Sequence, residues 1–223
     1  MFANKKLLVT LTAIFIAAFY GLYMSIVSAS PAITVQIVPS ADEVTPGQTF
    51  HVNVTISNIE SSHDLVGIEF KVKWNTTLLT AIKMELPPGH IFQAAEDDGN
   101  LWVIRKTVDN TAGEAWYMVT CNSLSQGYEN GYLPLTGGGV ICKITFNATQ
   151  VLGTSPLEFV ELPPQGLKIK LSNGQGQPIL DYQVVESSLT VIPEFPSVIL
   201  LISALLAVSA FYLARLKSSK LQN

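Results

Sequence analysis

Strict alternation of apolar and polar residues over residues 48–59 limits what this chain can fold into. In this segment, QTFHVNVTISNI, polar residues separate four apolar ones: Phe50, Val52, Val54 and Ile56. A period of two puts successive side chains on opposite faces of a β-strand, whereas an amphipathic helix needs a period of 3.6. The segment therefore predicts a strand with one buried and one exposed face.

Segments of the same kind recur along residues 30–191 and indicate one all-β domain. GIEFKVKW (67–74) alternates in the same way, and turn sequences such as TPGQ, DDGN and YENGY separate the segments. The further strand candidates are ITVQIV, LWVIRKTV, EAWYMVTC, GVICKITFNA, PLEFVEL, LKIKL and SLTVI. Eight or more short strands without a convincing amphipathic helix predict a two-sheet β-sandwich of the jelly-roll kind.

The first 29 residues have the pattern of a secretory signal peptide. Two lysines precede an apolar stretch at positions 7–27, and the sequence VSA at 27–29 is an A-x-A-like cleavage site. We expect cleavage after Ala29. The apolar stretch is long for a signal peptide, so an uncleaved N-terminal anchor is the alternative. Both interpretations export the domain that follows.

A second apolar segment, residues 197–214, has 18 residues without a charge. As a helix it would span about 27 Å, close to the thickness of a bilayer's hydrocarbon core. Basic residues follow in 215–223, so the positive-inside rule places this tail in the cytoplasm and the domain outside. Pro193 and Pro196 predict an extended stem over 192–196. The sequence therefore predicts a single-pass cell-membrane protein, with a buried core helix as the alternative.

The distribution of charge argues against one class of partner. The chain has 13 Lys+Arg and 17 Asp+Glu, but only eight of the basic residues lie between residues 30 and 195, together with all 17 acidic ones. The exported region therefore carries a net charge of about −9, which repels phosphate backbones. We expect no binding to nucleic acid.

Side chains suited to catalysis form no recognisable motif in this chain. His51, His63 and His90 are scattered without metal-ligand spacing, and there is no HExxH, GxSxG or Cys/His pattern. We expect no enzyme activity and interpret these histidines as ordinary surface or strand residues. The acidic residues 96–98 with Asn100 could supply oxygen ligands to calcium, but their spacing matches no EF-hand loop. A solvated acidic loop without a cofactor is the favoured interpretation.

The two cysteines, Cys121 and Cys142, lie in two of the predicted strands. Cys121 shares a strand face with Val119, and Cys142 shares one with Val140, so both could point into the core from neighbouring strands. Export favours oxidation, and a disulfide between them is therefore one expectation. Two buried free thiols are the alternative.

Sequons of the form N-x-S/T occur at Asn53, Asn75 and Asn147. Asn53 and Asn147 fall on the polar faces of their strands, and Asn75 opens the turn after Trp74. We predict glycosylation of at least one of them where the source organism has the machinery.

Four segments follow one another in a recognisable order. They are PGQTF at 46–50, GIEFKVKWNTTLL at 67–79, GVICKITF at 139–146 and VVESSLTVI at 184–192. The first three resemble the PGDT turn, the G-x-x-F-x-[LV]-x-Y-D-P-x-x-L strand and the G-x-[LIV]-x-x-[IL]-x-F strand of the cohesin family, and the fourth resembles its final strand. The resemblance covers residues 32–191.

This resemblance implies a nine-stranded extracellular binding module, related in fold to carbohydrate-binding domains. Cohesins recognise dockerin modules through one face of the sandwich, often with an acidic residue directly before the Phe of the second motif. Glu69 occupies that place here, and Lys71 lies on the same strand face, so these two are the candidate partner-binding residues. The family's frequent Asn two positions earlier is Gly67 here. For Glu69, an ordinary solvated strand residue is the alternative.

The expected partner is a dockerin-like or other surface protein. One alternative is direct binding of a polysaccharide, in relation to polysaccharide breakdown, and another is a structural role in the cell envelope. Carbohydrate binding usually needs a planar row of exposed aromatic residues. The available aromatic residues are Trp74, Trp102, Trp116 and Tyr117.

The tripeptide Pro193-Glu194-Phe195, followed by the apolar segment and basic residues, resembles the C-terminal sorting signals of archaeal surface proteins. In those proteins a membrane-embedded archaeosortase reads the tripeptide and removes the helix. The resemblance implies removal of residues 197–214, and a permanent anchor is the alternative.

Overall fold

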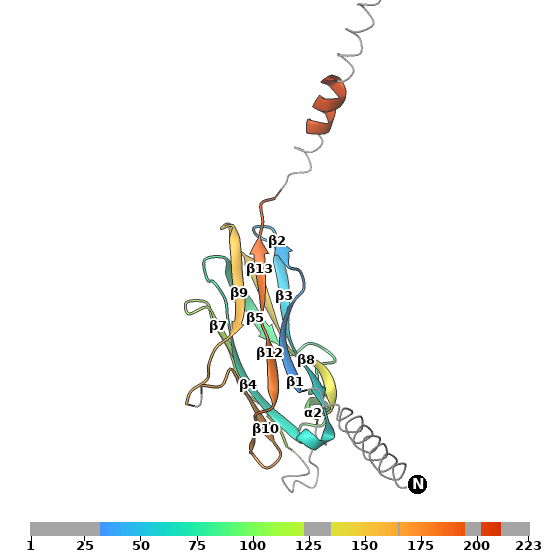
Figure 1. Ribbon diagram of the computed structural model, residues 1–223, viewed down its shortest axis with the longest axis vertical. Coiled ribbons are helices and arrows are strands. Elements are labelled where there is room, and N and C mark those ends of the chain that lie inside the picture. The colour runs from blue at the N-terminus through green and yellow to red at the C-terminus, as the bar shows by residue number, and fades with distance from the viewer. Residues whose placement is uncertain (1–31, 123–134, 165, 195–201, 211–223) are drawn as a thin grey trace, which may run out of the picture. The chain divides into compact units, whose positions relative to one another are not determined.

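The computed structural model describes residues 32–122, 135–164, 166–194 and 202–210. Its main body is a sandwich of two mixed β-sheets (Figure 1). The five-stranded sheet has the order β12-β1-β3-β8-β5, and the eight-stranded sheet runs β11-β10-β4-β9-β13-β2, with β7 beside β4 and β6 beside β7. The predicted two-sheet β-sandwich is therefore confirmed.

Each predicted strand segment corresponds to a strand, and the structure adds four further strands, β2, β5, β11 and β12. Two short helices also occur: a 3-10 turn at Ser61–His63 and α2 at Gln93–Asp97. The strands within the described residues are β1 (Ile33–Pro39), β2 (Glu43–Val44), β3 (Thr49–Ile59), β4 (Leu65–Lys73), β5 (Leu79–Glu85), β6 (Leu101–Asp109), β7 (Glu114–Cys121), β8 (Gly137–Ala148), β9 (Gly153–Phe159), β10 (Ile169–Asn173), β11 (Pro178–Ile179), β12 (Tyr182–Val185) and β13 (Ser187–Val191).

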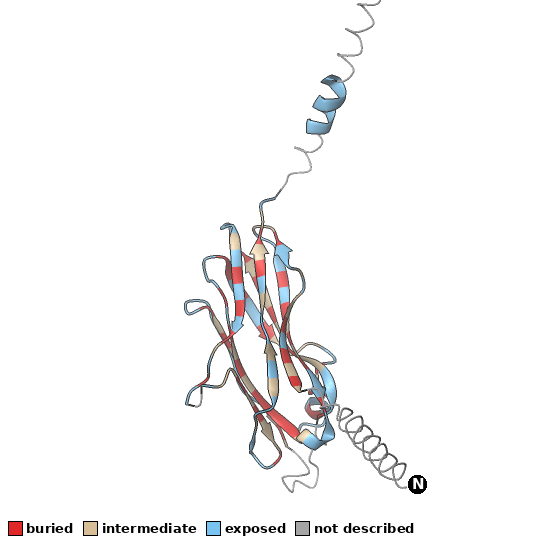
Figure 2. Ribbon diagram, in the orientation of Figure 1, coloured by how far each residue is buried: buried red, intermediate tan, exposed pale blue. Residues whose placement is uncertain are grey.

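The core lies between the sheets and is built from one face of each central strand. In β3 the alternating residues predicted to be apolar and inward are buried, and Figure 2 shows the same alternation along other strands. Phe50 stacks on Phe146 of the neighbouring strand β8 at 5.6 Å between ring centroids, and Trp74 meets Phe146 edge-on at 5.1 Å. Burial of each large apolar side chain stabilises the fold by roughly 1.5–3 kcal/mol.

Two β-bulges explain where the alternation pattern misleads. In β5, Ala81 lies opposite Phe146 and Lys83 lies opposite Thr145, so Ile82 is an extra residue that turns outward and is 56% exposed. In β8, Ile141 is an extra residue between Val140 and Cys142. Val140 and Cys142 therefore do not share a face, contrary to the simple count.

The predicted disulfide is not formed, because Cys121 and Cys142 are both free, buried thiols. Cys121 is in β7, which pairs with β4 and β6, whereas Cys142 is in β8, which pairs with β3 and β5. The two cysteines thus lie in different sheets rather than on neighbouring strands. The Cys121 thiol instead donates a hydrogen bond to the Val66 carbonyl, with 3.3 Å between Sγ and O.

The segments outside the sandwich are described only in part. Pro193 and Glu194 follow β13 as exposed, irregular chain, and residues 202–210 form an exposed helix. Within the described residues no helix is both long and apolar enough to cross a membrane. The predicted signal peptide, Phe195, the rest of the segment 197–214 and the tail 215–223 lie outside the described residues.

Candidate functional site

The candidate residues Glu69 and Lys71 lie on the outer face of the eight-stranded sheet. Strand β4 carries them between β10 and β7, and its alternate residues Ile68, Phe70 and Val72 point into the core. Strand register extends this outer surface across four strands, and we call it the Trp116 face. It comprises Lys170 and Ser172 of β10; Gly67, Glu69, Lys71 and Lys73 of β4; Glu114, Trp116, Met118 and Thr120 of β7; and Trp102, Arg105, Thr107 and Asp109 of β6.

The Glu69 carboxylate is held at the centre of this face by two partners. The Trp116 indole Nε1 donates to Glu69 Oε1 at 3.0 Å, and Lys170 Nζ lies 3.3 Å from Glu69 Oε2. The Glu69 side chain is only 12% exposed. The alternative interpretation, a freely solvated strand residue, therefore does not hold for Glu69. Its carboxylate is largely buried and fixes the orientation of Trp116.

The Trp116 ring also contacts two cations from the strands on either side of β7. Lys71 Nζ lies 4.3 Å from the ring centroid, and the Arg105 guanidinium carbon lies 3.8 Å from it. Lys71 in addition pairs with Glu114 at 3.3 Å. Cations over an indole face are attracted by the ring quadrupole, so Trp116 orders both side chains.

One end of the face is small and uncharged. A Cβ on Gly67 would lie 2.5 Å from Ser172 Oγ and 3.3 Å from Thr120 Oγ1, so the Asn that cohesins often carry there would displace its neighbours. A pocket of about 200 Å³ adjoins this end. It is lined by Leu167, Lys170, Leu171, Ser172, Gly176, Pro178 and Ile179.

Strand β6 forms the edge of the face and, among the described residues, pairs only with β7. Its residues Trp102, Val103 and Ile104 are 60%, 40% and 55% exposed, and none of its nine residues is buried. Asn110, in the turn after β6, holds this edge against the other sheet: its side chain accepts from Ala81 N at 2.8 Å and donates to Ala81 O at 2.9 Å. The edge is thus fixed in place while its apolar side chains stay in solvent.

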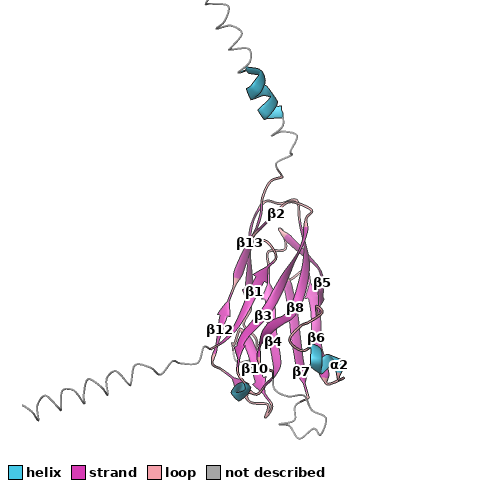
Figure 3. Ribbon diagram, turned by 90° about the vertical axis from the view of Figure 1, so that its right-hand side faces the viewer, coloured by secondary structure: helices cyan, strands magenta, loops and turns pink. Residues whose placement is uncertain are grey.

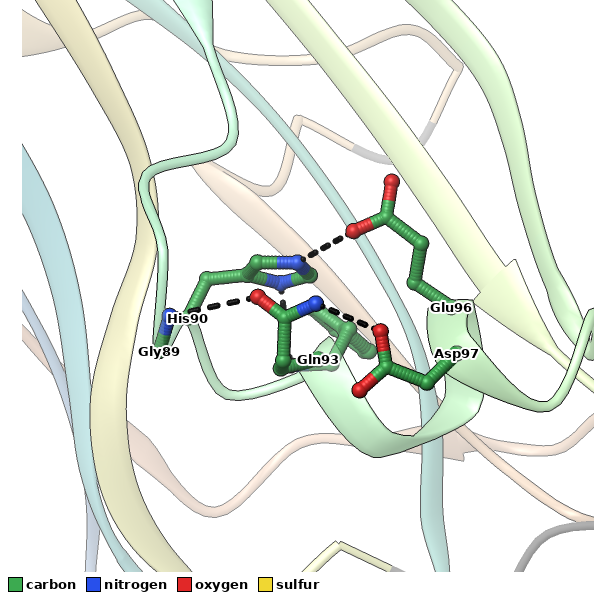
Figure 4. A network of polar contacts seen from close by, with 6 residues as sticks. Gly89, His90, Gln93, Glu96 and Asp97 are labelled. Atoms are coloured by element: carbon green, nitrogen blue, oxygen red, sulfur yellow. Dashed lines mark hydrogen bonds and ion pairs between the residues drawn. The ribbon is translucent and has the colours of Figure 1, made fainter.

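The acidic residues 96–98 belong to α2 and its C-terminal cap, beside a buried histidine (Figures 3 and 4). His90 is 3% exposed, which corrects its interpretation as a surface or strand residue. Its Nδ1 accepts from Phe92 N, and its Nε2 lies 2.8 Å from Glu96 Oε2, while Asp97 accepts from Gln93 Nε2 at 2.8 Å. These carboxylates turn to separate partners, and the described part of the chain holds no group of three His, Cys, Asp or Glu residues suited to a metal ion.

The buried ionisable groups of the core are not activated for chemistry. Burial raises the pKa of the Cys121 thiol to about 11 and also raises the pKa of Cys142. A nucleophilic cysteine needs the opposite shift. Burial likewise raises the pKa of the Tyr117 phenol, so these groups stay neutral at physiological pH.

The aromatic residues do not form a planar sugar-binding row. Trp74 and Tyr117 are buried, at 3% and 0% exposure. Trp116 has its ring against Lys71 and Arg105, which leaves Trp102 as the tryptophan with an open face. This arrangement disfavours direct carbohydrate binding through stacked aromatics.

The three sequons differ in how available their amides are. Asn75 is exposed, and its Oδ1 accepts from Thr77 N and Oγ1 in a tight turn. Asn53 is half-buried in the central strand β3. The Asn147 amide nitrogen donates to Gly47 O at 2.8 Å, so a glycan there would compete with a structural hydrogen bond.

Comparison with known proteins identifies the fold. The cohesin domain family model matches residues 34–162, more than half of the chain. Among solved structures, the second type II cohesin module of an adaptor scaffoldin from Acetivibrio cellulolyticus is 17% identical with a TM-score of 0.58, and the alignment covers 75% of this chain and 94% of that module.

Two further structures extend the likeness. A non-cellulosomal cohesin from the archaeon Archaeoglobus fulgidus has 13% identity and a TM-score of 0.50 over 73% of this chain and 92% of its own. A type I cohesin–dockerin complex from Clostridium thermocellum has 15% identity and a TM-score of 0.51 over 71% and 99%. No curated protein sequence matches the chain. On the family match and the shared fold together, the chain belongs to the cohesin domain family.

Proposed function

We propose that this chain is a non-catalytic cell-surface module that binds a dockerin-like protein through the Trp116 face. The observation that carries the proposal is the ordered group of Glu69, Lys71, Trp116 and Arg105 on the outer face of the sheet. Trp116 is half-buried, and its neighbours hold it in one orientation. Such an aromatic residue loses little entropy on binding, which is typical of binding hot spots.

Family membership supports a protein as the partner. The solved complex from Clostridium thermocellum pairs a cohesin with a dockerin, and another solved cohesin from Acetivibrio cellulolyticus is likewise in complex with a dockerin. The edge strand β6 adds apolar area beside the ordered group, as protein interfaces require at their centre.

Affinity capture tests this function. The full chain, purified in mild detergent, serves as bait for envelope proteins of the source organism, alongside Trp116→Ala and the matched control Gln36→Ala. Gln36 is exposed on β1 of the other sheet. We expect a protein that the wild type and Gln36→Ala retain and that Trp116→Ala loses by about 30-fold or more in affinity. Equal capture by all three, or capture of polysaccharide alone, would contradict the proposal.

The location of the module at the cell surface is part of the same proposal. It is supported by the uncharged segment 197–214 between a proline-containing stem and a basic tail. The tripeptide at 193–195 adds the prediction that the C-terminal helix is removed in the mature protein. Intact-mass and C-terminal peptide analysis decides whether the C-terminal helix is kept or removed. Peptides from AFYLAR at full yield indicate a permanent helix, and a chain that ends near Glu194 indicates processing.

A further inference from the structure

The Trp116 face differs in charge from the rest of the domain. Its four strands turn outward four basic residues, Lys71, Lys73, Arg105 and Lys170, and three acidic residues, Glu69, Asp109 and Glu114. The remaining sequence between residues 30 and 195 contains four basic and 14 acidic residues. The surface proposed to bind the partner is therefore weakly basic, although the domain as a whole is acidic.

Two of the three acidic residues of the face form ion pairs within it, and the third is hydrogen-bonded to the backbone. Glu69 is paired with Lys170 and with the Trp116 indole, and Glu114 is paired with Lys71. The Asp109 carboxylate accepts from the backbone N–H groups of Thr111 and Ala112 in the turn after β6. Glu69 and Glu114 are therefore compensated by lysines, and only Asp109, in the turn at the end of β6, keeps an exposed negative charge.

Two basic residues of the face have no ion pair within the described residues, Arg105 of β6 and Lys73 of β4. Arg105 is exposed and forms no ion pair in the part of the chain that the structure describes, whereas the adjacent Lys106 lies opposite the buried Tyr117 and does not belong to this face. Lys73, at the far end of β4, lies opposite Glu158 of β9 and is in part compensated. The excess positive charge is thus concentrated beside the exposed apolar residues 102–104.

Arg105 is held in a position in which it can pair with a carboxylate. Its guanidinium carbon lies 3.8 Å from the Trp116 ring centroid, so the group is held against the ring face. The N–H groups of a guanidinium point outward in its own plane, and a carboxylate accepts two of them in parallel. A stacked guanidinium also loses less freedom on forming such a pair than a free one.

We propose that the partner of this face is an acidic protein surface in which an Asp or Glu carboxylate pairs with Arg105 and a neighbouring apolar side chain packs on Trp102 and Ile104. This inference rests on the proposed function and specifies the chemistry of its partner. A second copy of the chain does not fit, because pairing of two β6 edges would bring Arg105 and Lys106 toward their own counterparts.

Selection of peptides from a random library measures this preference directly. The probe is a phage-displayed library of short peptides, selected against the full chain in mild detergent and against four variants: Trp116→Ala, Arg105→Glu, Arg105→Lys and Lys83→Glu. Lys83→Glu is the matched control, because it makes the same charge change on an exposed residue of the other sheet.

We expect peptides selected by the wild type to be enriched in Asp and Glu next to aromatic or aliphatic residues. Their affinity should fall about 10- to 100-fold with Arg105→Glu and about threefold to tenfold with Arg105→Lys, which keeps the charge but loses the two parallel bonds. It should be unchanged with Lys83→Glu. Selection on Arg105→Glu should shift toward Lys and Arg.

Three outcomes would overturn the inference. The first is a set of selected peptides whose binding is lost with Trp116→Ala but which are not enriched in Asp and Glu. That result would leave the proposed binding function intact. The second is peptides that ignore both Trp116 and Arg105, which removes the binding function as well. The third is binding of an acidic polysaccharide, tested with polygalacturonate, that is lost with Arg105→Glu, because the carboxylate would then belong to a glycan.

Discussion

Strands β3 and β6 carry apolar side chains of similar number but use them in opposite ways. Strand β3 lies between β1 and β8 and buries Phe50, Val52, Val54, Ile56 and Ile59. In the part of the chain that the structure describes, β6 pairs with β7 alone, and it buries none of its residues. A central strand supplies the core from one face. An edge strand that contributes little to the core keeps its apolar residues available for another molecule.

The largest effect on folding is expected from the central strand. Phe50→Ala removes a buried ring stacked on Phe146 and should lower the free energy of unfolding by about 3–5 kcal/mol. Denaturant unfolding of wild type and variant, followed by fluorescence, measures the difference. A loss below about 1 kcal/mol would mean that β3 does not anchor the core as its burial indicates.

A smaller loss is expected at the centre of the Trp116 face. Glu69→Ala leaves the Trp116 indole N–H without an acceptor and removes the carboxylate from Lys170, whose ammonium keeps its hydrogen bond to Pro163 O, and it should cost about 1.5–3 kcal/mol of stability. Glu69→Gln keeps an oxygen for the indole and should cost less. If both variants unfold like the wild type, the Glu69 contacts do not order this face.

The third prediction concerns the reactivity of the two buried thiols. Cys121 lies in β7, beside the edge strand β6, and Cys142 lies in β8, between β3 and β5 of the other sheet. Because burial raises the pKa of Cys121 to about 11, from 9.0, this thiol stays protonated in the folded protein at pH 8. Its contribution to stability is fully present below pH 9 and is lost as the pH rises toward about 11.

Timed alkylation at pH 8, read by mass spectrometry, should therefore find both thiols slow. Cys121 should react before Cys142, because it lies next to the edge strand β6 and opens more readily. Denatured, unreduced protein should alkylate fully at both positions. Incomplete alkylation there would reveal a disulfide and contradict the free thiols.

The smallest effect on folding is expected in β6 itself. Trp102→Ala removes a side chain that is 60% exposed and should change the free energy of unfolding by less than about 0.5 kcal/mol. The same variant should weaken partner binding, because its ring belongs to the proposed interface. A large loss of stability would show that Trp102 serves the fold rather than a partner.

The sequence predicts strands well where alternation is unbroken and fails where a bulge interrupts it. The pattern identifies β3 and β4, but it misses β5, because the extra residue Ile82 breaks the period of two. Ile141 has the same effect in β8 and misplaces Val140 relative to Cys142. Period counting carries no information on which strands share a sheet, and the disulfide prediction failed for that reason.

The candidate site could be predicted only in part. The resemblance of one strand to the cohesin family identifies Glu69 and Lys71. It does not identify Trp116 as a site residue, although alternation in EAWYMVTC places Trp116 on the face opposite to the buried Tyr117. Arg105 could not be found, because its contact with Trp116 depends on the pairing of β6 with β7 and on the bulge at Ile104.

Hydrogen exchange of the complex tests the central claim most directly. Amide exchange of the full chain is measured by mass spectrometry with and without the captured partner. If β6 and the Trp116 face form the interface, residues 101–109 should gain protection while residues 52–56, already paired on both sides, remain unchanged. Protection confined to β1, β12 or the helix at 202–210, with none at 101–109, would contradict it.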